Sequence, residues 1–328
     1  MDTLDRTKVV DQDLLPLTMV VADYDRTHPL LDGRVQPDGI KLKAVSGKIG
    51  YFCIRPVYEE YDIAEMSLSW YLMAHCREEP VVALPVFPLR MPVHAYLFCR
   101  SDASFNDPGD LAGKRVGAPR YRYTVNLWLR GIIEEHYGVS PGDMSWITTD
   151  EEGAGYEIPA GISVERRSGC DLEELLIDGE IDCLFSPIVP PAFRRGDPRI
   201  RRLFPDCSRE IARYFDSTGI FPITHTVVMG EALWRREPWI AERMLAAYRD
   251  AQQLVEAHYY NDPKHLTLPR AVLLLEEERA TFGPDPWSHG LATNRNVLDT
   301  FIRYAHEQGY IPRRPALEEL FAENTLTL

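Results

Sequence analysis

The sequence predicts an α/β protein with two lobes and a ligand cleft between them. With 328 residues, the chain is about twice as long as a usual single domain. Short apolar runs rich in β-branched residues alternate with amphipathic helical stretches, an order that is typical of largely parallel sheets. The composition changes at residues 101–110, where the polar segment SDASFNDPGD predicts a lobe boundary near residue 100.

Apolar runs of strand length precede this boundary. They lie at residues 17–22, 40–45, 61–66, 81–87 and 93–100. The polar segment 23–28 follows the first run, at the end of a strand where open α/β sheets bind ligands. A helix is expected at 67–75, with Ser67 or Ser69 as its N-cap.

The second lobe is expected to open with a helical turn and a short strand at 110–119. A helix follows, with Thr124 as its cap and its end before Gly138. Its core face is an apolar stripe at helical spacing, formed by Val125, Trp128, Leu129, Ile132 and Ile133. Residues 172–186 predict helix, turn and strand, which places Ser186 at a strand end and makes a second wall of the cleft.

The chain is expected to return to the first lobe near residue 220. The pattern then becomes mostly helical from Glu231 through Tyr259. The predicted first lobe is therefore discontinuous, with residues 1–99 and 221–328, and the second lobe takes residues 100–220.

The charge balance argues against nucleic acid as a partner. Fifty acidic and 36 basic side chains give a net charge of -14, which repels a polyanion. The arginines between Arg194 and Arg202 are interpreted as a solvated surface stretch. No window approaches the roughly 20 apolar residues that span a bilayer, so no membrane partner is expected.

The N-terminal segment MDTLDRTKVVDQDLLPL has no apolar stretch of signal-peptide length, and a cytoplasmic protein is expected. The six cysteines lie far apart, as reduced thiols of a cytosolic protein do. Motifs for dinucleotides, P-loops and nucleophile elbows are missing, and no HxxxH or HExxH spacing occurs. We therefore expect neither a metal nor another cofactor.

A set of segments spread over almost the whole chain resembles the 4,5-dihydroxyphthalate decarboxylases. They are YDRT at 24–27, AEMSLSWY at 64–71, PVFPLR at 85–90, GIFPITHTVV at 219–228 and DPWSHGLATNR at 285–295. The two-lobed order and DLAGKRVGAP at 110–119 resemble the type II periplasmic-binding-protein fold. The resemblance implies a cytoplasmic carboxy-lyase of aromatic catabolism and phthalate degradation, which converts 4,5-dihydroxyphthalate to protocatechuate and CO2 without a cofactor.

Loss of CO2 directly from an aromatic ring would leave an aryl anion in the ring plane. A feasible path first protonates the ring carbon that bears the carboxylate. A hydroxyl group para to that carbon supplies electron density to it, and CO2 leaves as aromaticity returns. A site for this reaction needs a base, an acid and anchors for anions.

Arginines are the first candidates for anchors because guanidinium binds carboxylate through paired hydrogen bonds. Arg26 and Arg90 lie at predicted strand exits, and Arg130 lies within a helix. Each of the three has a surface or inter-lobe ion pair as its alternative role, and Arg122 is expected to be solvated. The amides after Thr124 are a further anchor, because helix N-termini bind anions.

Histidines are the first candidates for proton transfer, since a pKa near ~6.5 suits an acid or a base. His225 and His94 each lie in a run that is expected to link the lobes, and a hydrogen-bonded hinge role is the alternative for both. Glu65 ends a predicted strand and is a candidate base or a structural hydrogen-bond partner. The expected neutral hydrogen-bonding groups are Ser67, Ser69, Tyr121 and Ser186.

Two other functions stay open at this point. A receptor that delivers a small aromatic or carboxylate anion to a transporter would use the same scaffold, although it would have to be exported. A desulfinase or dehydratase would keep the scaffold and change the reaction, because a fold does not fix its chemistry. The sequence also leaves open whether the chain forms a homo-oligomer.

Overall fold

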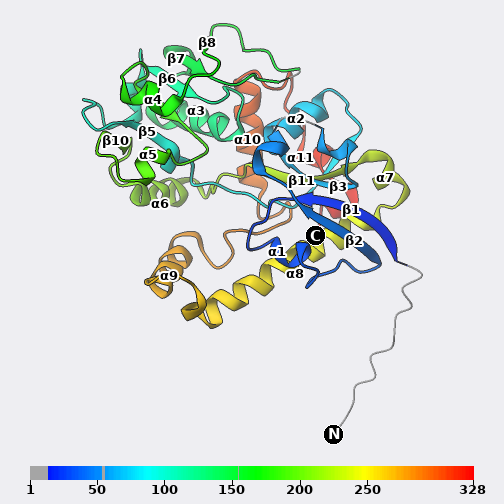
Figure 1. Ribbon diagram of the computed structural model, residues 1–328. Helices are drawn as coiled ribbons and strands as arrows, with labels where there is room; N and C mark the ends of the chain where they lie inside the picture. The colour runs from blue at the N-terminus through cyan, green and yellow to red at the C-terminus, as the bar shows by residue number, and fades with distance from the viewer. Residues whose placement is uncertain (1–13, 54–55, 154) are drawn as a thin grey trace.

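The computed structural model describes residues 14–53, 56–153 and 155–328, which form two lobes (Figure 1). The first lobe is built on a five-stranded sheet in the order β2-β1-β3-β11-β4. Its strands are β1 (Leu15–Val21), β2 (Ile40–Ser46), β3 (Ile63–Ser67), β4 (Val81–Leu84) and β11 (His225–Gly230). β1 runs parallel to β2 and β3, whereas β11 is antiparallel to β3 and β4.

The second lobe is built on a six-stranded sheet in the order β10-β5-β9-β6-β7-β8. Its strands are β5 (Leu97–Arg100), β6 (Arg115–Ala118), β7 (Ser145–Thr148), β8 (Ser163–Arg166), β9 (Cys183–Phe185) and β10 (Ile200–Arg202). β6 is parallel to β7 and β9, and β5 is antiparallel to its two neighbours. The exact lobe boundaries that the sequence suggests stay a prediction.

The helices cover both sheets and fill the space between them. They are α1 (His28–Leu31), α2 (Leu68–Cys76), α3 (Thr124–Tyr137), α4 (Leu172–Ile177), α5 (Pro191–Arg194), α6 (Cys207–Thr218), α7 (Glu231–Arg236), α8 (Trp239–Asn261), α9 (Ala271–Phe282), α10 (Arg295–Glu307) and α11 (Leu317–Leu320). Short 3-10 helices lie at Ile49–Cys53, Val57–Glu59, Val93–Tyr96, Pro108–Leu111, Pro141–Asp143, Pro263–His265 and Glu323–Thr325. In the part of the chain that is described, no helix is long and apolar enough to cross a membrane.

One hydrophobic core runs through both lobes. It joins residues of β3 and α2 in the first lobe to residues of β6 and α3 in the second, and α10 packs into it. α2 is buried on all sides, since every residue from Leu68 to Ala74 is buried. α8 covers the opposite face of the first sheet, and α4 and α5 cover the opposite face of the second. The two lobes are therefore held together by side-chain packing as well as by the segments that connect them.

Two antiparallel segments connect the lobes and form the floor between them. Thr224 N donates to Leu89 O at 2.9 Å, and Met91 N donates to Pro222 O at 3.0 Å. Arg90 and Ile223 form a single β-bridge between these hydrogen bonds. The pairing places Arg90 beside the start of β11, where His225 lies.

Several predicted elements need correction. β4 ends at Leu84 because Pro85, Pro88 and Pro92 cannot donate the hydrogen bonds of a sheet. The first half of the predicted strand 93–100 is a 3-10 helix, and only Leu97–Arg100 is a strand. Thr124 is the first residue of α3, so the N-cap position belongs to Tyr123, whereas the predicted end before Gly138 is confirmed.

Candidate active site

A buried carboxylate and an imidazole meet where the first sheet faces the second lobe. Glu65 lies on β3 and His225 begins β11, and His225 Nδ1 is 2.5 Å from Glu65 Oε1. The Glu65 side chain is completely buried, and His225 is 3% exposed. A buried carboxylate is costly unless it is paired and hydrogen-bonded, so its partners define this site.

Two further donors hold the Glu65 carboxylate. Tyr24 OH donates to Oε1 at 2.7 Å, and Ala22 N donates to Oε2 at 2.8 Å. Both donors follow β1, the parallel neighbour of β3, so the end of one strand surrounds the carboxylate on the next. An ionised carboxylate only accepts hydrogen bonds, which assigns the proton of this contact to His225 Nδ1. Nε2 is the second ring nitrogen of His225.

His225 lines a cavity of about 360 Å³ between the lobes. The other lining residues are Ile49, Gly50, Ser67, Leu89, Arg90, Met91, Pro92, Tyr96, Tyr123, Thr124, Val125, Pro187, Ile188 and Thr224. The walls are mainly apolar, and a few polar groups converge beside His225. A cavity of this size and composition suits a single aromatic ring with polar substituents.

The N-termini of α2 and α3 meet at this cavity and are joined by hydroxyl groups. Thr124 Oγ1 lies 2.7 Å from Ser67 Oγ and 2.8 Å from Ser69 Oγ, and it accepts from Ser69 N at 3.2 Å. The first-turn amides of a helix have no carbonyl partner within that helix. Thr124 and Val125 of the first turn of α3 both line the cavity, so this end of the helix is suited to an anion.

Arg90 brings a buried cation to the same cavity. Nη2 donates to Asn294 Oδ1 at 2.5 Å and to Ser288 O at 2.8 Å, both from the segment that precedes α10. Burial lowers the pKa of Arg90 to about 9, so the guanidinium stays positive at neutral pH. Its Nε has no hydrogen-bond partner among the described residues. The cation is therefore held in place by neutral acceptors, which do not themselves line the cavity.

Other predicted site residues lie outside the cavity. Arg26 donates through Nε and Nη2 to Pro88 O and lies 3.7 Å from the centre of the Trp287 ring. His94 packs between the rings of Phe204 and Tyr214, and burial lowers its pKa to about 4. Neither side chain lines the cavity.

The remaining predicted residues have structural contacts. Arg130 is fully buried and donates to Gln308 Oε1, to Tyr121 O and to Tyr310 OH. Ser186 Oγ donates to Ile188 O at 2.6 Å and so shapes the turn that brings Ile188 to the cavity. Arg122 was expected to be solvated, and this is wrong: it is 3% exposed, with its guanidinium over the Trp70 ring.

Sequence reasoning missed two kinds of residue. Tyr24 contacts Glu65 across 41 positions of sequence, although it belongs to the YDRT segment. Ile49 and Ile188 come from different lobes and both line the cavity, while their side chains stay well exposed. The isoleucine that follows Ser186 and Pro187 at a predicted strand end is the sequence signal that could have pointed to Ile188. The sequence does not show that Ile188 and Ile49 line one cavity.

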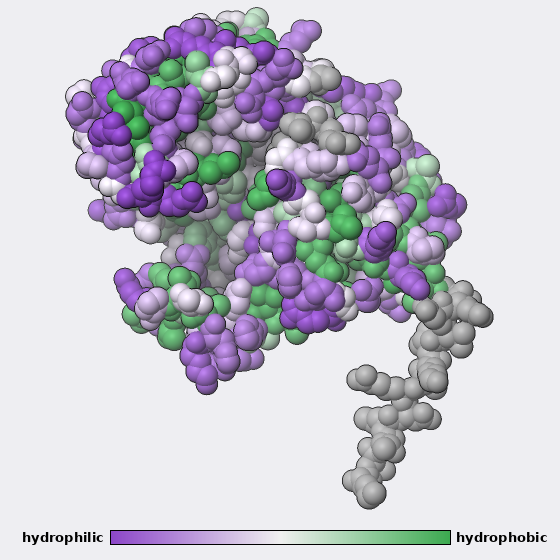
Figure 2. All heavy atoms as spheres, in the orientation of Figure 1, coloured by the Kyte–Doolittle hydropathy of each residue, from purple (hydrophilic) through white to green (hydrophobic). Residues whose placement is uncertain are grey.

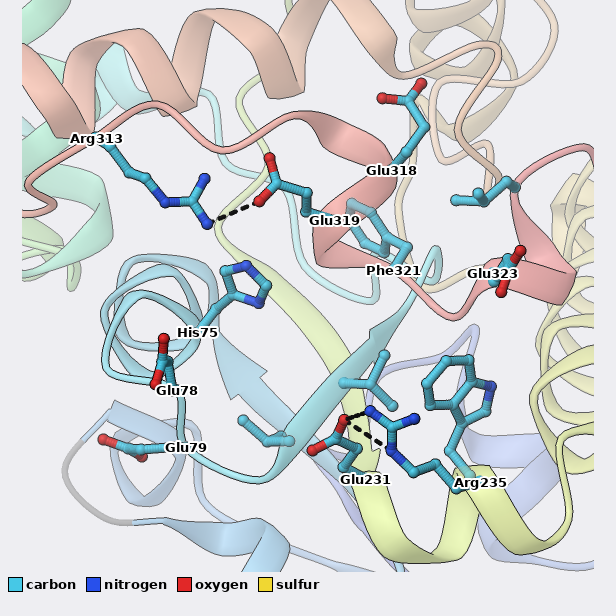
Figure 3. A pocket seen from close by; sticks show the side chains of 14 residues that line it. His75, Glu78, Glu79, Glu231, Arg235, Arg313, Glu318, Glu319, Phe321 and Glu323 are labelled. Carbon is cyan, nitrogen blue, oxygen red and sulfur yellow. Dashed lines mark hydrogen bonds and ion pairs between the residues drawn. The ribbon is translucent and has the colours of Figure 1, made fainter.

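A second cavity, of about 580 Å³, lies away from this site between α2, β4, α7 and α11 (Figure 3). Glutamates Glu78, Glu79, Glu231, Glu318, Glu319 and Glu323 line it together with Arg235 and Arg313. Arg313 is paired with Glu319, and Arg235 with Glu231. The excess of carboxylates repels an anion, so this second cavity is less suited to an anionic ligand than the cavity beside His225.

No cluster of three or more His, Cys, Asp or Glu side chains that could hold a metal ion occurs among the residues described. The expectation that the protein works without a cofactor stays a prediction.

The chain is 34% identical over 319 residues to 4,5-dihydroxyphthalate decarboxylase of Comamonas testosteroni, an alignment that covers 94% of this chain and 96% of the relative. The chain belongs to the 4,5-dihydroxyphthalate decarboxylase family. The enzyme of the same name from Pseudomonas putida is 34% identical over 203 residues, 58% of this chain and 78% of that protein. No family model matches the sequence. Membership of this decarboxylase family confirms the resemblance seen in the sequence motifs.

Solved structures confirm the type II periplasmic-binding-protein fold of this family member. The sulfonate-binding protein SsuA of Methylobacillus flagellatus superposes with a TM-score of 0.60 at 13% identity and covers 94% of this chain and 92% of its own. SsuA of Escherichia coli gives 0.54 at 13%, with the same coverage. The desulfurization enzyme DszB gives 0.51 at 16%, over 95% of this chain and 99% of its own. At these identities the likeness concerns the fold alone.

Proposed function

We propose that this chain is a cofactor-independent decarboxylase of hydroxylated aromatic carboxylates, with 4,5-dihydroxyphthalate as its substrate and protocatechuate and CO2 as its products. The observation that carries the proposal is the buried Glu65–His225 pair, because His225 lines a cavity of the size of one aromatic ring. Membership of the decarboxylase family supports the reaction class.

In this proposal, His225 is the acid that protonates the ring. The Nε2–H bond of the imidazolium breaks, and a C–H bond forms at the ring carbon that bears the carboxylate. The hydroxyl group para to this carbon donates a lone pair and stabilises the positive charge that the ring gains. The bond to the carboxylate then breaks, its electron pair restores aromaticity, and CO2 leaves. Water returns a proton to His225 before the next turnover.

Glu65 has a positioning and electrostatic role in this mechanism. The carboxylate fixes the orientation of the ring through Nδ1 and stabilises the imidazolium, while Tyr24 and Ala22 N hold the carboxylate itself. Because Glu65 is completely buried, its negative charge acts on His225 with little screening by water.

The substrate carries two carboxylates, and the cavity offers two places that favour an anion. One is the N-terminus of α3 with the hydroxyl groups of Thr124 and Ser67, and the other is the Arg90 guanidinium. We propose that these groups hold the substrate so that one carboxylate carbon lies beside His225. Fixed donors and a buried cation position the ring without a change in their own protonation.

The test is turnover by the purified full-length protein. Incubation with 4,5-dihydroxyphthalate is expected to release CO2 and form protocatechuate in equal amounts. The same assay with phthalate, which lacks the hydroxyl groups, is expected to give no product. Without a para hydroxyl group, nothing stabilises the positive charge that the ring gains when it is protonated. Thermal stabilisation by 4,5-dihydroxyphthalate without any CO2 would contradict the proposal and favour a receptor.

A further inference from the structure

The C-terminal end of α8, the connecting residues 262–270 and the whole of α9 form an arm that projects from the first lobe (Figure 1). Of the eight exposed large apolar side chains in the described part of the chain, five belong to this arm: Leu254, Leu268, Val272, Leu273 and Leu274. Figure 2 shows hydrophobic side chains on this arm, beside hydrophilic ones. Large exposed apolar side chains that cluster in this way mark a surface for another macromolecule.

The inner face of α9 already has partners in its own chain. Ala271 is buried, Leu275 faces Gln252 and Val255 of α8 across a small cavity, and Phe282 packs on Phe215 of α6. These positions follow helical spacing, so they form one stripe of the helix. The opposite stripe has no such cover, and Leu273 at its centre is 50% exposed.

The outer stripe of α9 has a self-complementary order of residues. Leu273, Leu274 and Glu277 lie within α9, and Arg270 is at its N-cap position. The spacing i, i+3, i+4 and i+7 places the four residues on one side of the helix. All four side chains are exposed. If two such helices pack antiparallel about an axis between residues 273 and 274, Leu273 meets Leu274 of the other copy and Arg270 meets Glu277. A twofold axis produces each of these contacts twice.

We propose that α9 is the contact surface for a second copy of this chain and that two copies pair through antiparallel α9 helices. Charge complementarity favours this occupant over an unrelated protein, because the basic and acidic ends of the stripe match each other in this register. Within one chain, Arg270 Nη2 and Glu277 Oε1 are 3.7 Å apart on exposed side chains, a weak pair that can exchange partners. The proposal does not depend on the reaction that the cavity catalyses.

The experiment measures the mass of the full-length protein in solution by sedimentation velocity over a range of concentrations. The wild-type chain is expected to form a dimer or an even-numbered assembly. Leu273→Asp is expected to halve its mass, because the substitution places two like charges at the twofold axis. Leu328→Asp is the matched control, since Leu328 is also exposed but lies outside the arm, and it is expected to leave the mass unchanged.

Charge exchange tests the register. Arg270→Glu and Glu277→Arg are each expected to weaken the dimer about tenfold, and the double variant is expected to restore it, because the two pairs then re-form with reversed signs. Thermal unfolding of every variant checks that the fold is kept. A monomeric wild-type chain, an assembly that Leu273→Asp leaves intact, or a double variant as weak as the single ones would each overturn the proposal.

Discussion

Glu65 and His225 occupy diagonal positions on two antiparallel strands of the first sheet. Glu65 is directly opposite Val227, and His225 is directly opposite Ser67, two positions further along. Diagonal neighbours on one face of a sheet are within reach of long side chains, and here the carboxylate and the ring nitrogen are 2.5 Å apart. The register of β3 and β11 thus sets the geometry of the proposed acid.

Tyr24 is expected to be a positioning residue for this pair. Tyr24→Phe removes the donor to Glu65 Oε1 and keeps the ring, so the carboxylate becomes less fixed while the cavity stays unchanged. We expect a roughly tenfold lower kcat with an unchanged KM, since the loss of one hydrogen bond to a charged group is about 1.5 kcal/mol. Tyr259→Phe is the matched control, because Tyr259 bonds to Asp25 instead. Equal activity of both variants would exclude this role for Tyr24.

Ile188 is expected to contact the substrate ring at the mouth of the cavity. It lines the cavity and is nevertheless 70% exposed, so a bound aromatic ring would cover it. Ile188→Ala is expected to raise KM for 4,5-dihydroxyphthalate about tenfold, and Ile188→Asp is expected to raise it further by repelling the carboxylates. Leu268→Ala changes an exposed apolar residue outside the cavity and serves as the control. If the KM values of Ile188→Ala and Ile188→Asp equal that of the wild-type chain, Ile188 does not contact the substrate.

His94 is expected to make the fold sensitive to acid. Burial lowers its pKa to about 4, below its ordinary value of about 6.5, so the folded chain holds it neutral. Below pH 6.5, His94 is protonated in the unfolded chain but stays neutral in the folded chain. The free energy of unfolding therefore decreases as the pH falls from 6.5 towards 4. Between pH 7 and pH 5 the loss from this group is roughly 2 kcal/mol.

His94→Phe tests this linkage, because phenylalanine keeps an aromatic ring between Phe204 and Tyr214 and cannot be protonated. Urea unfolding at the two pH values is expected to show a smaller acid loss in the variant than in the wild-type chain. The same loss in both proteins would mean that other groups carry the pH dependence.

The activity is expected to survive removal of metal ions. We expect the protein to keep its kcat after dialysis against a chelator, because the proposed steps use only a carboxylate, an imidazole and anion-binding groups. The measurement is turnover of 4,5-dihydroxyphthalate before and after chelation, with metal analysis of both samples. Loss of turnover that a divalent cation restores would require a different mechanism.

The sequence predicted the two lobes and the strands β1, β2, β3, β6 and β9, whereas the strands predicted at 81–87 and 93–100 are shorter in the structure. Glu65 could be chosen because it ends a predicted strand, and His225 because it lies in a run that is expected to link the lobes. The position of Arg26 could not be predicted, because its guanidinium turns onto Trp287 in a distant segment. His94 lies in the other run that is expected to link the lobes, but Val93–Tyr96 forms a 3-10 helix, and the His94 ring packs on aromatic side chains away from the cavity.

The kcat values of three variants under saturating 4,5-dihydroxyphthalate test the central claim most directly. His225→Gln removes the proposed acid and is expected to lower kcat by about a thousandfold or more. Glu65→Gln keeps the shape but not the charge and is expected to lower kcat by about a hundredfold. His94→Phe, a buried histidine outside the cavity, is expected to retain nearly full activity. Nearly full activity of His225→Gln, or loss of activity only in His94→Phe, would contradict the account.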